Sequence, residues 1–371
     1  MLFEPIRIGN LTLPNRLLRS ATWEGMATDE GDVTDALVAL YRDLARGGVG
    51  LIVTGFAYVS PAGKALPRQL GIYDDRQVEG LGRIAEAVHE EGGKVAVQIV
   101  HAGAQTRPEW IGDETPLAPS DVVTAEGNQA AQGLATEAID DVLTDFGAAA
   151  RRAREAGFDA VQLHVAHGYL LSQFLSPHRN QRTDEYGGSA ERRLRAPLAA
   201  LEVVRAAVGA DFPVLAKLNA VDCVDGGLTL EDSVPAARAL AEGGLDGLKV
   251  SGGIPDAGKL GAVRSGIQAH DNEGYFRAEA AAIKAAVDIP VHVVGGLRSP
   301  ELCEEILAAG DADGVALCRP FIREPDLPRR WQSGDPAVSE CISCRGCLKQ
   351  GMGGGIACHV LAKKRKQETE S

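Results

Sequence analysis

Four cysteines lie within eighteen residues near the C-terminus of a chain that has seven in all. They form the run Cys341-Ile-Ser-Cys344-Arg-Gly-Cys347, and Cys358 follows after ten further residues. Bacterial ferredoxin motifs begin with the same spacing, so the first interpretation is an iron-sulfur cluster. Structural zinc sites more often pair two separated C-x-x-C sequences, and zinc is the alternative. Unrelated thiols or a disulfide framework fit less well, because disulfides are typical of small secreted domains.

A second reactive group is the sequence His164-Val-Ala-His167-Gly-Tyr169, which follows a short apolar run. Any single histidine is more often a satisfied core residue than a functional one. Two imidazoles and a phenol within six residues favour function, because two N–H donors can hold one oxygen while the tyrosine delivers a proton. This combination predicts a site that polarises a carbonyl.

Other polar residues stand where apolar runs would otherwise continue. Thr22, Gln98 and Lys217 could together line a planar heterocycle, with Gln98 at an amide edge and Lys217 stabilising negative charge on a reduced ring. Later in the chain come Gly295-Gly296 and Cys318-Arg319, which could hold a phosphate through backbone N–H groups and the guanidinium. The glycine pair is equally consistent with a tight turn alone.

The elements that must position these residues alternate between short apolar runs and longer amphipathic segments, which is typical of parallel strands joined by helices. The predicted strands are 16–21, 50–54, 94–100, 160–164, 213–218, 247–250, 290–294 and 314–317. The predicted helices are 35–46, 77–91, 140–156, 189–208, 230–242, 275–287 and 299–309. Eight strands predict an α/β fold of the (β/α)8 TIM-barrel type, with the reactive residues at the C-terminal strand ends.

The predicted organisation is a barrel over residues 1–335, a cysteine-cluster extension over 336–362 and a disordered tail over 363–371. Residues 6–13 predict a β-hairpin around Gly9-Asn10 that could plug the barrel floor. A doubly wound open sheet is the alternative fold. It is disfavoured because no strand leads into a G-x-G-x-x-G helix start.

The bulk composition limits the partners. The chain of 371 residues has a net charge of −13, which offers no basic face for nucleic acid. No signal peptide or apolar membrane span is found in the sequence, so a cytoplasmic protein is expected. The expected partners are small molecules or other proteins.

These residues together resemble the old yellow enzyme family of flavin oxidoreductases over nearly the whole chain. The resemblance is carried by residues 2–5, 14–16, 98–103, 167–177, 180–188, 295–296 and 319–327. It implies a barrel with non-covalent FMN contacted by Thr22, Gln98 and Lys217, whose phosphate is held by Gly296 and Arg319. It also implies that His164 and His167 bind the activating oxygen of the substrate and that Tyr169 donates a proton.

The cysteines resemble the branch that includes 2,4-dienoyl-CoA reductase and trimethylamine dehydrogenase, in which such residues hold a 4Fe-4S cluster beside FMN. The chain lacks the second half of those relatives, and its spacing before Cys358 is shorter. The first functional hypothesis is an ene-reductase that takes electrons from NADH or NADPH. A dehydrogenase of amines or alcohols that passes electrons to a separate protein is the second, and a non-catalytic electron carrier is a third. The segment 106–136 has no readable motif and could form a lid, and a homo-oligomer is compatible with the apolar barrel surface.

Overall fold

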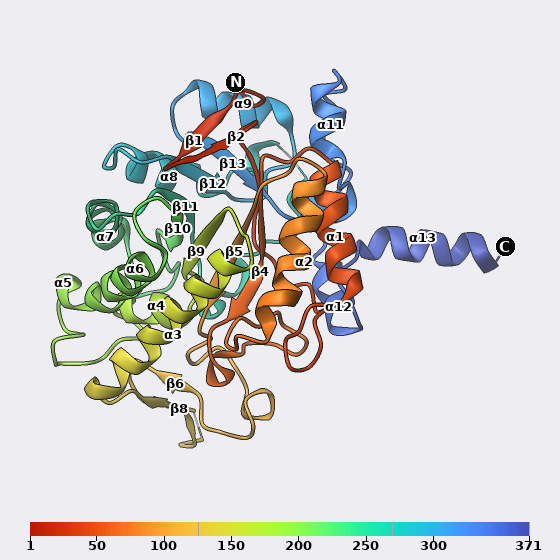
Figure 1. The fold of residues 1–371 in the computed structure, drawn as a ribbon. Helices are drawn as coiled ribbons and strands as arrows, with labels where there is room; N and C mark the ends of the chain where they lie inside the picture. The colour runs from red at the N-terminus through yellow and green to blue at the C-terminus, as the bar shows by residue number, and fades with distance from the viewer. Residues whose placement is uncertain (125, 269, 371) are drawn as a thin grey trace.

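The centre of the computed structural model, which describes residues 1–124, 126–268 and 270–370, is a closed barrel of parallel strands (Figure 1). Each barrel strand pairs with the barrel strands that precede and follow it in the chain, and the last strand pairs with the first to close the barrel. The eight strands are β3 (Leu17–Arg19), β4 (Leu51–Tyr58), β5 (Val95–Val100), β9 (Ala160–Val165), β10 (Val214–Asn219), β11 (Gly247–Ser251), β12 (Val291–Val294) and β13 (Gly314–Leu317). The predicted barrel and all eight predicted strands are confirmed, with end shifts of a few residues.

The strands lack an alternating polar face because the barrel buries both sides of each strand. In β9 and β10 every residue is buried, including the polar Gln162, His164 and Lys217. A barrel strand faces side chains inside and helices outside, so near-continuous apolar runs are the expected sequence. Polar residues within such runs therefore point into the barrel or to its mouth.

Helices surround the barrel as predicted, with a few differences at their ends. The main ones are α1 (Asp35–Arg46), α2 (Gln77–Glu90), α3 (Thr136–Glu155), α4 (Leu170–Leu175), α5 (Ala190–Arg193), α6 (Arg195–Val208), α7 (Leu230–Glu242), α8 (Arg277–Lys284) and α9 (Pro300–Ala308). Short 3-10 helices lie at η1 (Pro61–Gly63), η2 (Pro108–Trp110), η3 (Pro255–Leu260) and η4 (His270–Asn272). The predicted helix 189–208 is divided between α5 and α6 at Leu194.

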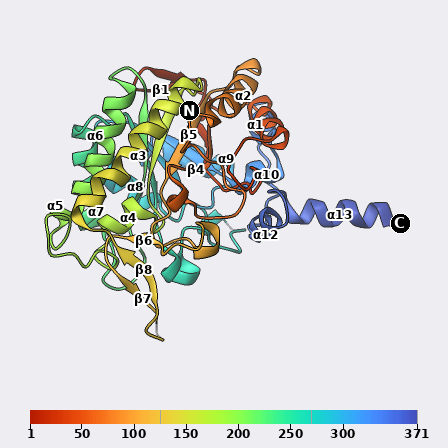
Figure 2. The ribbon, with the colours of Figure 1, turned by 60° about the horizontal axis from the view of Figure 1, so that its bottom comes forward.

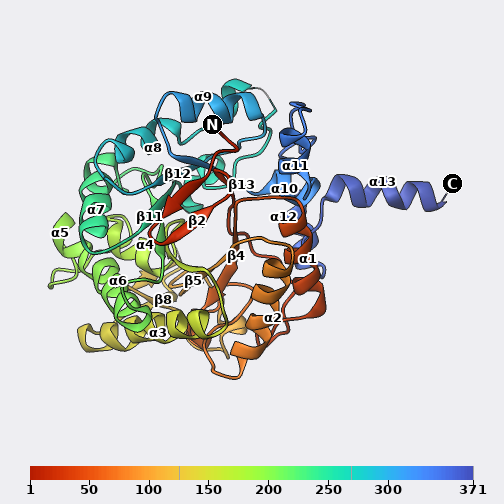
Figure 3. The same cartoon turned by 45° about the horizontal axis from the view of Figure 1, so that its top comes forward.

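A hairpin closes the end of the barrel opposite the strand C-termini, as the sequence predicts. Strands β1 (Ile6–Ile8) and β2 (Leu11–Leu13) pair antiparallel and lie across that end in Figure 3. Ile8 and Leu13 are fully buried in one apolar cluster with Leu18, Leu51 and other strand residues. Burial of these side chains seals the barrel floor, so access to its interior is from the other end.

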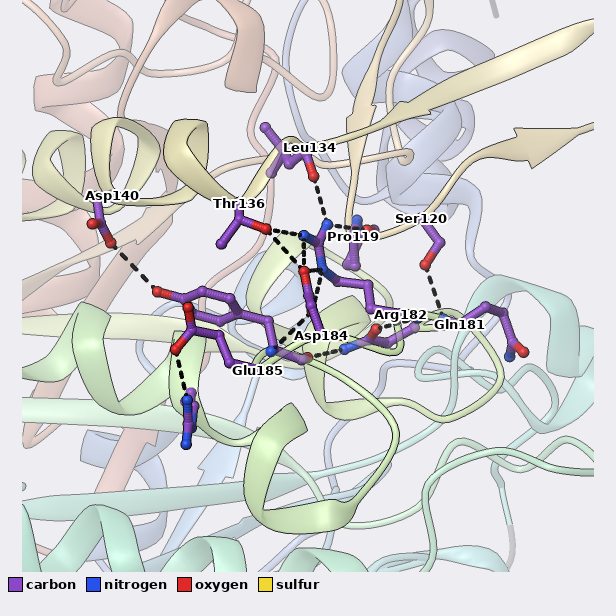
Figure 4. Close-up of polar contacts among 12 residues, drawn as sticks. Pro119, Ser120, Leu134, Thr136, Asp140, Gln181, Arg182, Asp184 and Glu185 are labelled. Carbon is purple, nitrogen blue, oxygen red and sulfur yellow. Dashed lines mark hydrogen bonds and ion pairs between the residues drawn. The ribbon is translucent and has the colours of Figure 1, made fainter.

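The segment between β5 and α3 contains structure that the sequence did not predict. Strands β6 (Leu117–Ala118), β7 (Val122–Val123) and β8 (Gln129–Gly133) form a small sheet that projects from the barrel (Figure 2), and Ala125 lies outside the described residues. Arg182 fixes its base by donating from Nη1 to the carbonyls of Pro119 (2.8 Å) and Leu134 (2.5 Å), as Figure 4 shows. The strands have only two to five residues, which is too short to be detected from periodicity.

After the barrel the chain forms α10 (Arg319–Arg323), α11 (Leu327–Gln332), α12 (Gly346–Met352) and α13 (His359–Glu370). Helix α13 extends away from the barrel in all three ribbon views (Figures 1, 2 and 3). The predicted disordered tail from Lys363 is instead helical through Glu370, and Ser371 lies outside the described residues. A run without Gly or Pro and a Lys364–Glu368 ion pair spaced i,i+4 favour this helix. Among the described residues, no helix is both long and apolar enough to span a bilayer.

Candidate active site at the barrel mouth

The C-terminal ends of the strands surround an open pocket of about 1170 Å³, including the space at its mouth. The position agrees with the general placement of active sites in such barrels. Predicted site residues that line it are Thr22, His164, His167, Tyr169, Lys217, Gly296, Cys318 and Arg319. Gln98 and Gly295 are not among the lining residues. Gln98 is fully buried behind the wall, where its Nε2 donates to Gln162 Oε1 at 2.7 Å.

The end of β9 brings the two histidines and the tyrosine together, as the sequence suggested. The ring centroids of His164 and His167 are 5.3 Å apart, and those of His164 and Tyr169 are 4.7 Å apart. Phe56 of β4 packs against Tyr169 with a centroid distance of 5.2 Å. The two imidazoles of His164 and His167 and the phenol of Tyr169 therefore lie side by side in one wall of the pocket.

His167 is held by two contacts from neighbouring strands. Its backbone has φ +62°, a left-handed conformation that is uncommon outside glycine. The N–H of His167 donates to Asn219 Oδ1 at 3.1 Å, and its Nε2 lies 2.8 Å from Ser251 Oγ. Asn219 Nδ2 in turn donates to the buried Asp222 carboxylate at 2.8 Å. These contacts fix the imidazole position against the strain of its backbone.

Burial and nearby cations keep the histidines neutral. Burial first, then Lys217 and Lys249, lowers the pKa of His164 well below its usual range, and burial and the same lysines do so for His167. Burial also lowers the pKa of Lys217 to about 8 and raises the pKa of Tyr169. At neutral pH the site therefore presents neutral imidazoles, a protonated phenol and a lysine that is mostly charged.

The opposite wall comes from the first and last strands of the barrel. Thr22 Oγ1 and Cys318 Sγ are in contact across it. Gly296 has φ +73°, and a Cβ there would lie 2.8 Å from Tyr275 Cε1, so only glycine fits without displacement. Arg319 Nη1 donates to the carbonyls of Arg264 (2.8 Å) and Ser343 (3.3 Å). The wall thus combines a tight glycine turn with a fixed cation.

The four C-terminal cysteines line a second, small cavity. Cys341, Cys344, Cys347 and Cys358 surround it together with Arg319 and parts of α10 and α13. Cys347 and Arg319 also line the main pocket, so the two cavities adjoin. Burial raises the pKa of the Cys341 thiol and that of Cys347, the latter to about 12. Within the described ranges, no three His, Cys, Asp or Glu side chains are grouped as needed to bind a single metal ion.

The cysteine segment is attached directly to the pocket wall. Arg68 Nη2 donates to the carbonyls of Gly351 and Met352 in α12, both at 2.9 Å. Gly351 packs against the indole of Trp23, which lines the pocket, and a Cβ there would lie 2.8 Å from Trp23 Cζ3. The cysteine segment is therefore in direct contact with the pocket wall at Gly351.

Several lining residues were not predicted from the sequence. Trp23, Phe56 and Tyr275 line the pocket, but as single aromatic residues they carry no local sequence signal of function. Ser251 lies one residue beyond the end of the predicted strand 247–250 and would have been found had that strand been extended. Lys249 and His292 are buried in the barrel interior and are not among the lining residues, but they interrupt apolar strands and could have been noticed as titratable residues in predicted core positions.

The fold and the pocket define a barrel enzyme with an open site at the strand C-termini, lined by both polar and apolar side chains. The chain belongs to the NADH:flavin oxidoreductase / NADH oxidase family, whose sequence profile it matches over residues 1–337. The predicted membership of the old yellow enzyme family is thereby confirmed.

Individual relatives differ in length. The NADH oxidase of Thermoanaerobacter brockii is 40% identical over 350 residues, which cover 94% of this chain and 53% of that protein. The 4,4'-dithiodibutanoate disulfide reductase of Rhodococcus erythropolis is 34% identical over 94% of this chain and 92% of its own length. The solved complex of 2-naphthoyl-CoA reductase with 2-naphthoyl-CoA has a TM-score of 0.87 at 26% identity, over 96% of this chain and 56% of that one. The chain thus spans about half the length of some relatives and nearly all of another.

Proposed function

We propose that the pocket binds FMN and that the chain reduces an alkene conjugated to a carbonyl, an enone or enoyl-type substrate. The observation that carries this proposal is the grouping of His164, His167 and Tyr169 on one wall, beside Lys217. A site that only carried electrons would not need a proton donor next to two oxygen-binding groups. Family membership supports a flavin at this position.

The residues present fit FMN. Lys217 is 4% exposed, and its ammonium donates no hydrogen bond to the described residues, so it is available to a negative ring edge. Thr22 stands at the same end of the barrel, and Gly296 and Arg319 provide a glycine turn and a cation for the phosphate. Gln98, with an unpaired buried Oε1, would reach the pyrimidine edge only after its side chain turned away from Gln162. When bound, FMN supplies the hydride.

The side chains of the protein then stabilise the developing charge and transfer a proton. As the substrate β-carbon gains hydride, negative charge develops on the carbonyl oxygen, and the neutral imidazoles of His164 and His167 are positioned to stabilise it by donating N–H hydrogen bonds. The raised pKa of Tyr169 keeps its proton on the phenol until the substrate α-carbon accepts it. Loss of one such donor typically costs about 3 kcal/mol, or a rate factor on the order of a hundred.

We further propose that Cys341, Cys344, Cys347 and Cys358 hold a 4Fe-4S cluster, with zinc as the alternative. The support is their C-x-x-C-x-x-C spacing and their location around one cavity. A bound cluster would supply single electrons next to the flavin pocket, because Cys347 lines both cavities. That adjacency favours a second candidate function, a dehydrogenase that passes electrons to a separate protein rather than drawing them from NADH or NADPH.

The test begins with anaerobically purified protein, its absorption spectrum and its content of FMN, iron, sulfide and zinc. NADH, NADPH and a reduced protein carrier are then compared as electron donors, and a series of enones as oxidants of the reduced enzyme. We expect an enone to reoxidise the flavin faster than buffer alone; no acceleration by any enone would contradict the ene-reductase proposal. Stoichiometric zinc without iron would refute the cluster and leave the reductase intact.

Tyr169→Phe separates the half-reactions. It should slow alkene reduction on the order of a hundredfold and leave flavin reduction nearly unchanged. Tyr58→Phe is a matched control, because it removes a phenol that donates to Glu30 O at 2.7 Å outside the pocket. Equal losses in both half-reactions of Tyr169→Phe would refute its role as proton donor.

A further inference from the structure

A row of titratable side chains crosses the barrel interior from the pocket toward the floor. In the register of neighbouring strands, His164 pairs with Lys217, Lys217 with Lys249, and Lys249 with His292. His164 is the fifth residue of β9, Lys217 the fourth of β10, Lys249 the third of β11 and His292 the second of β12. Each step around the barrel therefore lies one residue nearer the strand N-termini.

The lower members of this row are buried without hydrogen-bond partners. Lys249 and His292 are 0% exposed, and neither Lys249 Nζ nor either ring nitrogen of His292 has a partner among the described residues. His292 Cδ2 would lie 2.3 Å from a Cβ on Gly314, so glycine makes the space for this ring. Buried polar groups are seldom left unpaired in proteins, and such a group calls for a specific explanation.

The charges around Lys249 are mostly positive. Lys217 on β10 and Arg19 on β3 face it and, after burial, lower its pKa well below the usual range, while Cys318 beyond β13 acts weakly in the opposite direction. Lys249 in turn lowers the pKa of His164, His167 and His292. Arg19 is already paired with Glu24, at 3.0 Å. Within the described part of the chain no carboxylate hydrogen-bonds to the Lys249 amine, and burial together with the neighbouring cations favours its neutral form.

We propose that Lys249 takes up a proton when flavin in the pocket is reduced. This inference rests on the proposed FMN site. Two-electron reduction of FMN adds one proton to the ring and leaves one negative charge near Lys217. A second proton, drawn from water, converts the Lys249 amine to an ammonium and balances that charge. The electrons come from the reductant, so two electrons and two protons enter the protein together.

Measurement of the flavin midpoint potential against pH tests the proposal directly. For a two-electron couple, each proton taken up shifts the potential by about 30 mV per pH unit. Between pH 5.5 and 7, at least about one pH unit below the pKa of Lys217 at about 8, Lys217 is about 90% protonated or more. The FMN-loaded wild type should therefore show a slope of about 60 mV per pH unit, for two protons.

Lys249→Met should halve this slope to about 30 mV per pH unit. Lys259→Met, which removes an exposed lysine, is the matched control and should keep the wild-type slope. If the methionine variant does not retain FMN, Lys249→Gln keeps a polar group in the row and should give the same halved slope.

Two results would overturn the proposal: a wild-type slope of about 30 mV per pH unit, or a Lys249 variant with the wild-type slope. The second result would place proton uptake on His292 or another member of the row. Failure of the proposed function looks different, because a chain that binds no FMN has no flavin potential to measure.

Discussion

Replacement of Glu24 by glutamine tests the buried network that joins β3 to β4 behind the pocket. Glu24 Oε1 accepts hydrogen bonds from Arg19 Nη2 (3.0 Å), the Tyr41 hydroxyl (2.5 Å) and the Gly55 N–H (2.8 Å). The side chains of Arg19 and Glu24 are 2% and 3% exposed, so solvent cannot replace either partner. A Cβ on Gly55 would lie 1.9 Å from Glu24 Oε2, which shows how closely this carboxylate is enclosed.

The expected loss of folding stability follows from the charges of Glu24 and Arg19. Glutamine can still accept hydrogen bonds, but three bonds to a carboxylate become bonds to a neutral amide, and each weakens by about 1 kcal/mol. The Arg19 guanidinium is also left without a counter-charge. We therefore expect Glu24→Gln to lower the free energy of unfolding by about 3 kcal/mol, within the range typical of a broken buried pair.

Equilibrium urea unfolding, followed by far-ultraviolet circular dichroism, measures this loss. Glu90→Gln is the matched control, because Glu90 pairs with Arg42 at 2.7 Å on the surface, where side-chain exposures of 34% and 55% predict less than about 1 kcal/mol. The double variant Arg19→Met, Glu24→Gln should lose less than the sum of its single variants, because the second change removes the unpaired charge. A Glu24→Gln loss no larger than that of Glu90→Gln, or strict additivity in the double variant, would refute the reasoning.

Three further outcomes are expected. Gly296→Ala should weaken FMN binding about tenfold in fluorescence titrations of the apoprotein. Gly310→Ala is the control, because Gly310 has the same φ of +73° but no atom within 4 Å of an added Cβ, and FMN binding should stay unchanged. Equal effects of the two substitutions would show that the contact of the added Cβ with Tyr275 is not the cause. FMN binding should weaken about fivefold as the pH rises from 7 to 9, because Lys217, with its pKa lowered to about 8, loses its charge. Lys217→Met should abolish this pH dependence of binding. If the pH dependence persists in the variant, Lys217 is not its cause. Hydrogen bonds from Arg182 lower the pKa of Asp184 to about 2, below its value in the unfolded chain. The ionised carboxylate therefore stabilises the fold above about pH 4, and this contribution is lost as the pH falls toward 2. Asp184→Asn should expose the segment 117–135 to limited proteolysis at neutral pH, and unchanged cleavage would show that Asp184 does not anchor this segment.

The sequence by itself predicted the barrel, because eight buried strands and their helices each carry a local hydrophobic signature. It also placed His164, His167 and Tyr169 at one strand end, since three reactive residues within six positions need no tertiary information. The small sheet at 117–133 and the helix α13 were not predicted. The small sheet depends on contacts from Arg182 to Pro119 and Leu134, which are 63 and 48 residues away in the chain. Helix α13 is a polar segment without a buried face.

Only the tertiary structure decided which polar residues meet. Gln98 has the same place in β5 as Lys217 has in β10, the fourth residue of the strand, yet Gln98 turns to Gln162 on the neighbouring strand, while Lys217 lines the pocket. The contact between the cysteine cavity and the main pocket through Cys347, and the descending row from His164 to His292, depend on strand register and on packing between distant segments. Local periodicity determines that a strand forms and which residues it buries. The stagger between strands determines which buried side chains become neighbours, and no local pattern in the sequence encodes that stagger.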